Sequence, residues 1–341
     1  MFGSDLNRRT ALKTMMAGTA VLATPAILRA QTLKKVRFGT NWVAEAEHGG
    51  YYQAIADGTY ERAGLDVEIV MGGPQANNRL LFYTRGLDFY MGGNMIQSFL
   101  AVREEIPSRV IAAIFQKDPQ CLLAHPGKYA TFEDLKKSQS IYISNEGVAS
   151  YYQWMISKYG FKVDQVKPYT YNYAPFLSDP DSVQQGYATS DPYKVGLEAG
   201  FEPDVFLLAD NGFSTYSTMI EARNETIDSD PEMVQTFVDA SILGYTNFLY
   251  GDNAAARALI LKDNPDTTME RMDATIANMK SFGIVDSGDT LTMGIGAMTD
   301  ARMKGFFDEM VAVGVVDGTL DLAASYTLAF VNKGIGLDIP R

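Results

Sequence analysis

Short apolar runs and amphipathic stretches alternate along the first half of the chain. The strand-like runs are VRFGT at 36–40, LDVEIV at 65–70, LDFYMGG at 87–93 and RVIAAIFQ at 109–116. The stretches between them, including GGPQANNRLLFYTRG at 72–86 and NMIQSFLAVREE at 94–105, have helical character. Strands that alternate with helices are typical of βαβ units, so the pattern predicts a mostly parallel sheet flanked by helices.

A second series of the same kind follows. Its strand-like runs are CLLAH at 121–125, SIYIS at 140–144, YTYNY at 169–173 and DVFLLAD at 204–210, with helices expected at 131–137 and 149–159. From residue 230 onward the chain turns mainly helical. After the capping sequence Ser229-Asp230-Pro231, apolar side chains recur at helical spacing, at Val234, Val238, Ile242, Tyr245 and Leu249. These stripes predict core helices.

The first thirty residues have the pattern of an export signal. Arg8 and Arg9 form a twin-arginine pair, and a mostly small or apolar stretch follows from Thr14 to Leu28. A membrane anchor is the alternative, but this stretch contains Pro25 and is shorter than the ~20 residues that a spanning helix needs. We expect export through the twin-arginine route, cleavage near Ala30 and a periplasmic location.

Composition narrows the class of protein further. The first thirty residues hold four basic residues and one acid, so the remainder carries 25 Lys and Arg against 40 Asp and Glu, a net charge near −15. Such a surface repels nucleic acid, and we expect no nucleic-acid partner. With 46% hydrophobic residues the chain can form two cores. The single cysteine, Cys121, cannot form an internal disulfide.

Four segments follow strand ends, where ligands gather in open α/β sheets: 41–50, 71–75, 91–95 and 144–150. Small residues there could let a ligand approach the backbone. Aromatic residues stand close by, namely Trp42, Tyr51, Tyr52, Tyr90, Tyr151, Tyr152 and Trp154. They could form the walls of a cleft, because ring faces stack on conjugated solutes. The alternative is that they belong to the core, and Asp191 in SDPYK could serve only as a helix cap.

Motifs for catalysis are missing from the sequence. There are two histidines, His48 and His125, and no nucleophile elbow, phosphate-binding loop or dinucleotide fingerprint. Glu45, Glu47 and His48 could ligate a metal, but they match no known ligand spacing. We therefore expect no metal, no cofactor and no enzymatic activity.

Several segments in order along the chain resemble a known family. They are TNWVAEAEHGGYYQAIADGTYERAGLDVEIVMGGP at 40–74, LDFYMGGNMIQSF at 87–99, IFQKDPQCLLAHP at 114–126 and QQGYATSDPYK at 184–194. Together they resemble the periplasmic solute-binding proteins of ATP-binding-cassette importers, in the branch shared with thiamine-pyrimidine biosynthesis proteins. Relatives are described for thiamine pyrimidine precursors, riboflavin, taurine, aliphatic sulfonates and nitrate.

The resemblance implies a two-lobed α/β fold of the type II periplasmic-binding-protein kind, joined by two hinge strands. The lobes would be 32–118 plus 218–341 and 119–217, with joins in the apolar runs around 118 and 214. Asn41 and Trp42 match the pair that lines the pyrimidine site of the relatives. Asp191 stands where the relatives often have glutamate. The biosynthetic enzymes carry a cysteine-rich motif that this chain lacks.

The resemblance and the residues lead to one ligand hypothesis. We expect a monomer that captures a small heteroaromatic nutrient, best a thiamine-related pyrimidine, and delivers it to the permease and ATPase subunits of an importer. A sulfonate, taurine or nitrate anion is the alternative, and a pyrimidine biosynthetic enzyme a further one. The expected ligand-binding residues are Asn41, Trp42, Glu45, His48, Tyr51, Gly92, Asn94, Gln116, Asn145, Tyr151, Tyr187 and Asp191.

Overall fold

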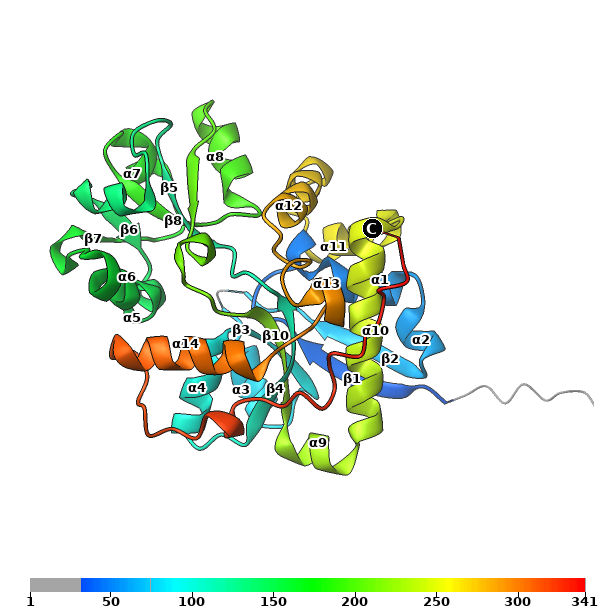
Figure 1. Cartoon of the computed structure of the whole chain (residues 1–341). Helices are drawn as coiled ribbons and strands as arrows, with labels where there is room; N and C mark the ends of the chain where they lie inside the picture. The colour runs from blue at the N-terminus through cyan, green and yellow to red at the C-terminus, as the bar shows by residue number, and fades with distance from the viewer. Residues whose placement is uncertain (1–31, 74, 341) are drawn as a thin grey trace, which may run out of the picture. The chain divides into compact units, whose positions relative to one another are not determined.

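The strands form two separate sheets of five strands each in the computed structural model (Figure 1). The structure describes residues 32–73 and 75–340, and the expected export signal lies outside them. Residues 33–341 form a unit of their own. Its two sheets confirm the predicted two-lobed α/β class.

The first sheet has the strand order β2-β1-β3-β10-β4. These strands are β1 (Lys34–Gly39), β2 (Leu65–Val70), β3 (Phe89–Asn94), β4 (Ser108–Phe115) and β10 (Ser217–Arg223). The helices between its first four strands are α1 (Gly49–Ala56), α2 (Thr59–Arg62), α3 (Asn78–Tyr83) and α4 (Met95–Arg103). We call this sheet and its helices, with the helices that follow β10, lobe I.

The second sheet has the order β7-β6-β8-β5-β9 and with its helices forms lobe II. Its strands are β5 (Gln120–Ala124), β6 (Ile141–Ile143), β7 (Val166–Pro168), β8 (Val183–Tyr187) and β9 (Asp204–Leu207). Its helices are α5 (Asn145–Ala149), α6 (Tyr151–Tyr159), α7 (Ala174–Ser178) and α8 (Asp191–Ala199). The chain passes between the sheets after β4 and again before β10, and the lobe boundaries at 118/119 and 217/218 stay a prediction.

Both sheets are mixed rather than mostly parallel. In the first sheet β1 runs parallel to β2 and β3, but β10 pairs antiparallel with β3 and β4. In the second, β6 is parallel to β7 and β8, while β5 is antiparallel to β8 and β9. The difference arises because β5 and β10 directly follow the passages between the lobes, where the chain enters each sheet without a crossover helix.

The C-terminal third is helical, as its periodicity predicts. It comprises α9 (Asn224–Ser229), α10 (Pro231–Tyr250), α11 (Ala254–Asp263), α12 (Met269–Ser281), α13 (Thr290–Met293) and α14 (Asp300–Ala312). Helix α10 packs closely on α1, because a Cβ on Gly244 would lie 2.2 Å from the carbonyl oxygen of Gly50. A Cβ on Gly50 would likewise meet the ring of Tyr245 at 2.1 Å. The glycines of GGYY therefore serve helix packing and not the approach of a ligand.

Candidate functional site

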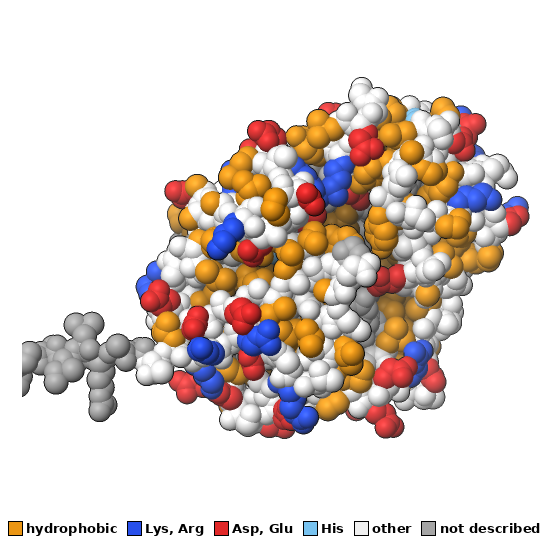
Figure 2. Space-filling model, turned by 180° about the vertical axis from the view of Figure 1, so that it is seen from behind, with side chains coloured by type: hydrophobic (Ala, Val, Ile, Leu, Met, Phe, Trp, Pro, Cys, Tyr) orange, Lys and Arg blue, Asp and Glu red, His pale blue; other side chains and the backbone are white. Residues whose placement is uncertain are grey.

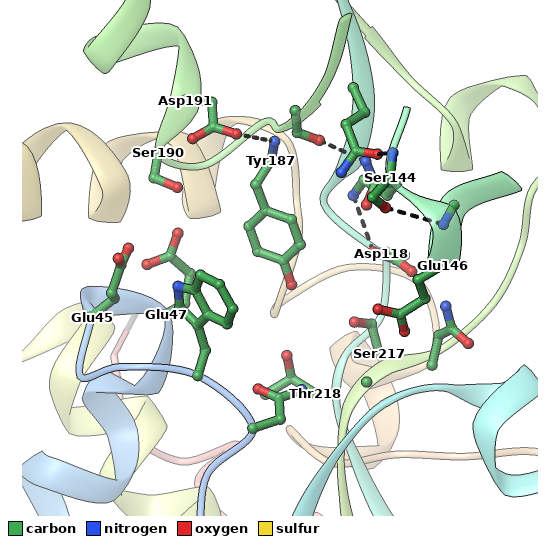
Figure 3. Close-up of a pocket in the computed structure, with 18 of the residues that line it drawn as sticks. Glu45, Glu47, Asp118, Ser144, Glu146, Tyr187, Ser190, Asp191, Ser217 and Thr218 are labelled. Atoms are coloured by element: carbon green, nitrogen blue, oxygen red, sulfur yellow. Dashed lines mark hydrogen bonds between the residues drawn. The ribbon is translucent and has the colours of Figure 1, made fainter. Parts of the chain in front are cut away.

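A cavity of about 650 Å³ is lined by residues of both lobes and of the first passage between them. Its walls come from loops at strand ends and from the first turns of helices. Figure 3 shows Glu45 and Glu47 on one side of Tyr187, with Asp118 and Glu146 on the other. The cavity thus lies where open α/β sheets place ligands.

The loop after β1 forms one wall and is held by a compact hydrogen-bond arrangement. The hydroxyl of Thr40 donates to the carbonyl oxygen of Trp42 at 2.8 Å and accepts from the amide of Gly72 at 3.0 Å. A side chain at Gly72 would not fit, because its Cβ would lie 2.4 Å from the carbonyl oxygen of Thr40. This scaffold leaves the Trp42 ring 36% exposed at the cavity, with its centroid 5.9 Å from the ring of Tyr171 in lobe II.

A short 3-10 helix, η1 (Ala46–His48), follows this loop and places acids at the cavity. Glu45 accepts two hydrogen bonds from Nη2 of Arg271, at 2.7 and 2.8 Å. Burial, and then the nearby charge of Glu47, raises the pKa of Glu45 to about 7, while Arg271 opposes this rise. Burial lowers the pKa of His48 to about 4, so its imidazole is neutral at pH 7. In the part of the chain that the structure describes, no cluster of acids, histidines or cysteine fits a metal ion.

Lobe II contributes the opposite wall from β8 and the start of α8. Asp191 accepts a hydrogen bond from the amide of Tyr187 at 2.8 Å and another from the hydroxyl of Tyr173 at 2.7 Å. Its carboxylate therefore fixes the local fold of lobe II. Gln185 holds the wall in place, since its Oε1 accepts from the amide of Ser144 at 2.5 Å and from the hydroxyl of Tyr151 at 3.1 Å.

The loop after β7 supplies three further rings, Tyr169, Tyr171 and Tyr173, all at the cavity. The sequence pattern predicts a strand here, but β7 ends at Pro168 and the tyrosines lie in a loop. Tyr171 has a positive φ of 60° and is 63% exposed. The clustering of three tyrosines in five residues is the signal that could have identified this wall.

The first passage between the lobes places Asp118 at the cavity. It is 5% exposed, accepts from the amide of Gln120 at 3.0 Å and is hydrogen-bonded by the side chain of Asn94. Burial raises the pKa of Asp118 to about 6. Sequence analysis did not identify this acid, because its position at the cavity depends on how the chain passes from β4 in the first sheet to β5 in the second.

Eight of the twelve expected ligand-binding residues line the cavity, and their contact with a ligand stays a prediction. They are Asn41, Trp42, Glu45, His48, Asn94, Tyr151, Tyr187 and Asp191. The structure brings further residues to the cavity that were not among the twelve, including Glu47, Tyr90, Gln97, Asp118, Glu146, Tyr169, Tyr171, Tyr173, Gln185, Lys194, Ser217 and Thr218.

The other four expected residues lie outside the cavity lining. Tyr51 packs in the core of lobe I, 4.4 Å from the ring of Phe38. Gly92 faces Glu221, whose Oε1 would be 2.1 Å from an added Cβ. Gln116 is buried and donates to the carbonyl oxygen of Ala297 at 2.9 Å. Asn145 is exposed at the start of α5.

Four of the seven aromatic residues that could have walled the cleft lie outside the cavity lining and belong to the core, namely Tyr51, Tyr52, Tyr152 and Trp154. Tyr152 and Trp154, on α6, are fully buried. The indole Nε1 of Trp154 donates to Glu309 on α14 at 2.9 Å. Burial of these rings follows the usual preference for large apolar side chains within helices.

The comparisons with known proteins agree with this architecture. A family model described as NMT1/THI5 like matches residues 45–255. Riboflavin-binding protein RibY of Chloroflexus aurantiacus is 26% identical over 331 residues, which cover 92% of this chain and 91% of that protein. The periplasmic aliphatic sulphonate binding protein SsuA from Escherichia coli superposes with a TM-score of 0.62 at 10% identity, covering 85% of this chain and 91% of that one. The desulfurization enzyme DSZB superposes with a TM-score of 0.55 at 11% identity, covering 88% and 98% of the two chains.

Two α/β lobes around a shared cavity define the two-lobed periplasmic-binding-protein fold. The family match covers more than half of the chain. The chain belongs to the NMT1/THI5-like family, and the resemblance inferred from the sequence is confirmed.

Proposed function

We propose that this protein is the extracytoplasmic ligand-binding component of an ATP-binding-cassette importer, and that it captures a small heteroaromatic nutrient between its lobes. The fold, the family and the riboflavin-binding relative support this role. Closure of the lobes over the ligand would be the state that the permease and ATPase subunits recognise, a population shift driven by differential affinity.

The composition of the cavity wall is the observation that carries the ligand class. Among the described residues, the lining includes seven aromatic side chains: Trp42, Tyr90, Tyr151, Tyr169, Tyr171, Tyr173 and Tyr187. It also includes five acids, Glu45, Glu47, Asp118, Glu146 and Asp191, and one lysine, Lys194. Rings favour a flat conjugated ligand and carboxylates favour one with N–H donors.

The same composition argues against a sulfonate, taurine or nitrate ligand. At 4 Å, two like charges repel by about 4 kcal/mol at an effective dielectric constant of ~20. Arg271 already pairs with Glu45 and Lys194 lies 3.4 Å from Asp191, so neither cation is left to bind an anion. An anion would therefore bind against the local field, although the fold alone is shared with a sulphonate binding protein.

The cavity size bears on which heteroaromatic compound is bound. A volume of about 650 Å³ lies within the ~300–1,000 Å³ range typical of sites for drug-sized ligands. That volume accommodates a fused ring system of the flavin type as well as a single pyrimidine. Riboflavin and the aminopyrimidine precursor of thiamine are therefore the two leading candidates, in that order.

We further propose that the ligand leaves unchanged and that the protein acts in the periplasm. Cys121, in β5, is fully buried and burial raises the pKa of its thiol, so it is a poor nucleophile.

None of the described helices is long and apolar enough to cross a membrane. On the face seen in Figure 2, acidic and basic side chains are interspersed with hydrophobic ones, and no broad basic patch for nucleic acid stands out.

A thermal-shift panel tests the proposed function. The purified mature chain would be heated with riboflavin, the aminopyrimidine precursor of thiamine, taurine, an alkanesulfonate or nitrate. A ligand at a hundred times its Kd stabilises the folded state by about 2.7 kcal/mol, which raises Tm measurably. We expect a rise with a heteroaromatic compound. A rise with the anions alone would contradict the proposal.

A further inference from the structure

Two hydrogen bonds accepted by cavity-lining acids join the lobes. The hydroxyl of Thr189 in lobe II donates to Glu47 Oε1 of lobe I at 2.6 Å. At the other end of the cavity, Gln97 Nε2 of lobe I donates to Glu146 Oε1 of lobe II at 2.9 Å. The two differ in burial, because Glu47 is 5% exposed whereas Glu146 is exposed to solvent.

The second carboxylate oxygen of Glu47 has an unusual environment. Among the described residues, no group donates a hydrogen bond to this buried Oε2. The side chain cannot easily turn away, because the Glu47 carbonyl oxygen accepts from the Tyr245 hydroxyl at 2.8 Å and Oε1 is held by Thr189. A buried carboxylate oxygen without a donor is unfavourable, so this group needs a partner at the cavity.

The other acids of the cavity are in a different situation. Glu45 is paired with Arg271, and Asp191 holds Tyr173 and the amide of Tyr187. Asp118 accepts from Gln120, and Glu146 can be hydrated. Within the described lining, Glu47 alone among the acids combines deep burial with an unpartnered oxygen.

We propose that Glu47 is the specificity-determining residue of the cavity, accepting a ring or exocyclic N–H of the ligand through Oε2 while Oε1 holds Thr189. The inference rests on the proposed function and deepens it, because it specifies the ligand class as heteroaromatic compounds that carry an N–H donor. The ligand and Thr189 of lobe II would then donate to the two oxygens of the same carboxylate, that of Glu47. Binding of the donor therefore removes the penalty that otherwise opposes closure around Glu47.

The first test combines protein variants with modified probes in a double-mutant cycle. The affinity of each pair is measured by calorimetric titration. The probes are riboflavin and 3-methylriboflavin, which lacks the ring N–H, and the aminopyrimidine with its dimethylamino counterpart. We expect Glu47→Gln to weaken binding of the N–H probe at least tenfold and to leave the affinity for the methylated probe within about twofold. Equal losses for both probes, or no loss, would overturn the proposal.

A matched control is Glu309→Gln. Glu309 also joins the lobes, since it accepts from Trp154 and Lys158 of lobe II, but it lies outside the cavity lining. We expect this variant to affect both probes alike. Discrimination between the probes by Glu309→Gln as strong as that by Glu47→Gln would overturn the assignment of specificity to Glu47.

The second arm measures lobe closure without ligand, so it remains decisive if no probe binds. Spin labels at Glu61→Cys in lobe I and Glu198→Cys in lobe II would report interlobe distances, because both positions are exposed and Cys121 is buried. Thr189→Val removes the donor and should lower the closed fraction, whereas Glu47→Leu removes the unpartnered carboxylate and should raise it. Unchanged distances in both variants would overturn the coupling. Opposite shifts without binding of any probe would support the coupling and refute the proposed ligand class.

Discussion

Each lobe carries a tryptophan in an aromatic segment behind a strand, and the two side chains occupy opposite environments. Trp42 follows β1 in a loop and is 36% exposed at the cavity. Trp154 lies in the fourth position of α6 and is fully buried. Its ring packs 5.2 Å from Phe213, and its Nε1 donates to Glu309 of lobe I. An aromatic residue ahead of the first helical turn faces the cavity here, and one inside the helix faces the core.

The difference extends to the charges beside each ring. The loop that exposes Trp42 leads directly into the buried Glu45 and Glu47. In α6, by contrast, the partly exposed Lys158 lies 5.2 Å from the centroid of the buried Trp154 ring and pairs with Glu309. The loop region thus carries unfavourable buried charge, and the α6 region carries favourable packing. This division is typical of a binding site placed on a stable scaffold.

The largest expected effect is on folding, from Trp154→Ala. Removal of a fully buried indole from the core should lower the free energy of unfolding by about 3–5 kcal/mol. Urea denaturation followed by circular dichroism measures this change. A loss below about 1 kcal/mol would break the comparison, because it would place Trp154 outside the structural core.

The next effect concerns pH and the loop region. The pKa of Glu45 rises from its ordinary 4.5 to about 7, chiefly through burial. Between these values the folded state holds a proton that the unfolded state has lost, so this group's contribution is fully present below pH 4.5 and is lost as pH rises through 7. We expect this contribution to the free energy of unfolding to fall by about 3 kcal/mol over that range.

Glu45→Gln tests this prediction by urea denaturation at pH 4.5, 5.5, 6.5 and 7.5. The difference between wild type and variant isolates Glu45, because Asp118 and the other titrating groups remain in both proteins. Parallel curves for the two proteins would contradict the raised pKa and would indicate that Arg271 keeps Glu45 ionised at every pH.

The sequence predicted the features that depend on local pattern. The two-lobed arrangement came from the resemblance to a known family, whereas the alternation of strands and helices predicted the α/β class and the segment following β1 predicted the wall that contains Asn41 and Trp42. The α/β class and this wall both depend on residues that are neighbours within one helical turn or one strand. The antiparallel direction of β5 and β10 depends on how the chain crosses between the lobes, which involves residues far apart in the sequence. It was therefore not predicted.

The roles that the sequence missed are set by partners far along the chain. From the sequence, Gly50 could belong to a turn or contact a ligand. Its role in helix packing becomes evident only from its contact with Gly244 in the structure. The free oxygen of Glu47 depends on Thr189, 142 residues away, and on Arg271 satisfying Glu45 instead. The tyrosines at 169–173 alternate as in a strand, but Pro168 offers no amide donor and β7 ends there.

The smallest effect in free energy is on binding, from Trp42→Ala, and it bears most directly on the comparison. Loss of one stacking face should weaken binding of a heteroaromatic probe by about 2 kcal/mol, or roughly 30-fold. Because the ring is 36% exposed, Tm without ligand should change little. Calorimetric titration with riboflavin and a ligand-free melt measure the two quantities, with Trp42→Phe as a control that retains stacking. A large fall in the ligand-free Tm would show that Trp42 acts as Trp154 does, in the core, and would remove the distinction between the two regions.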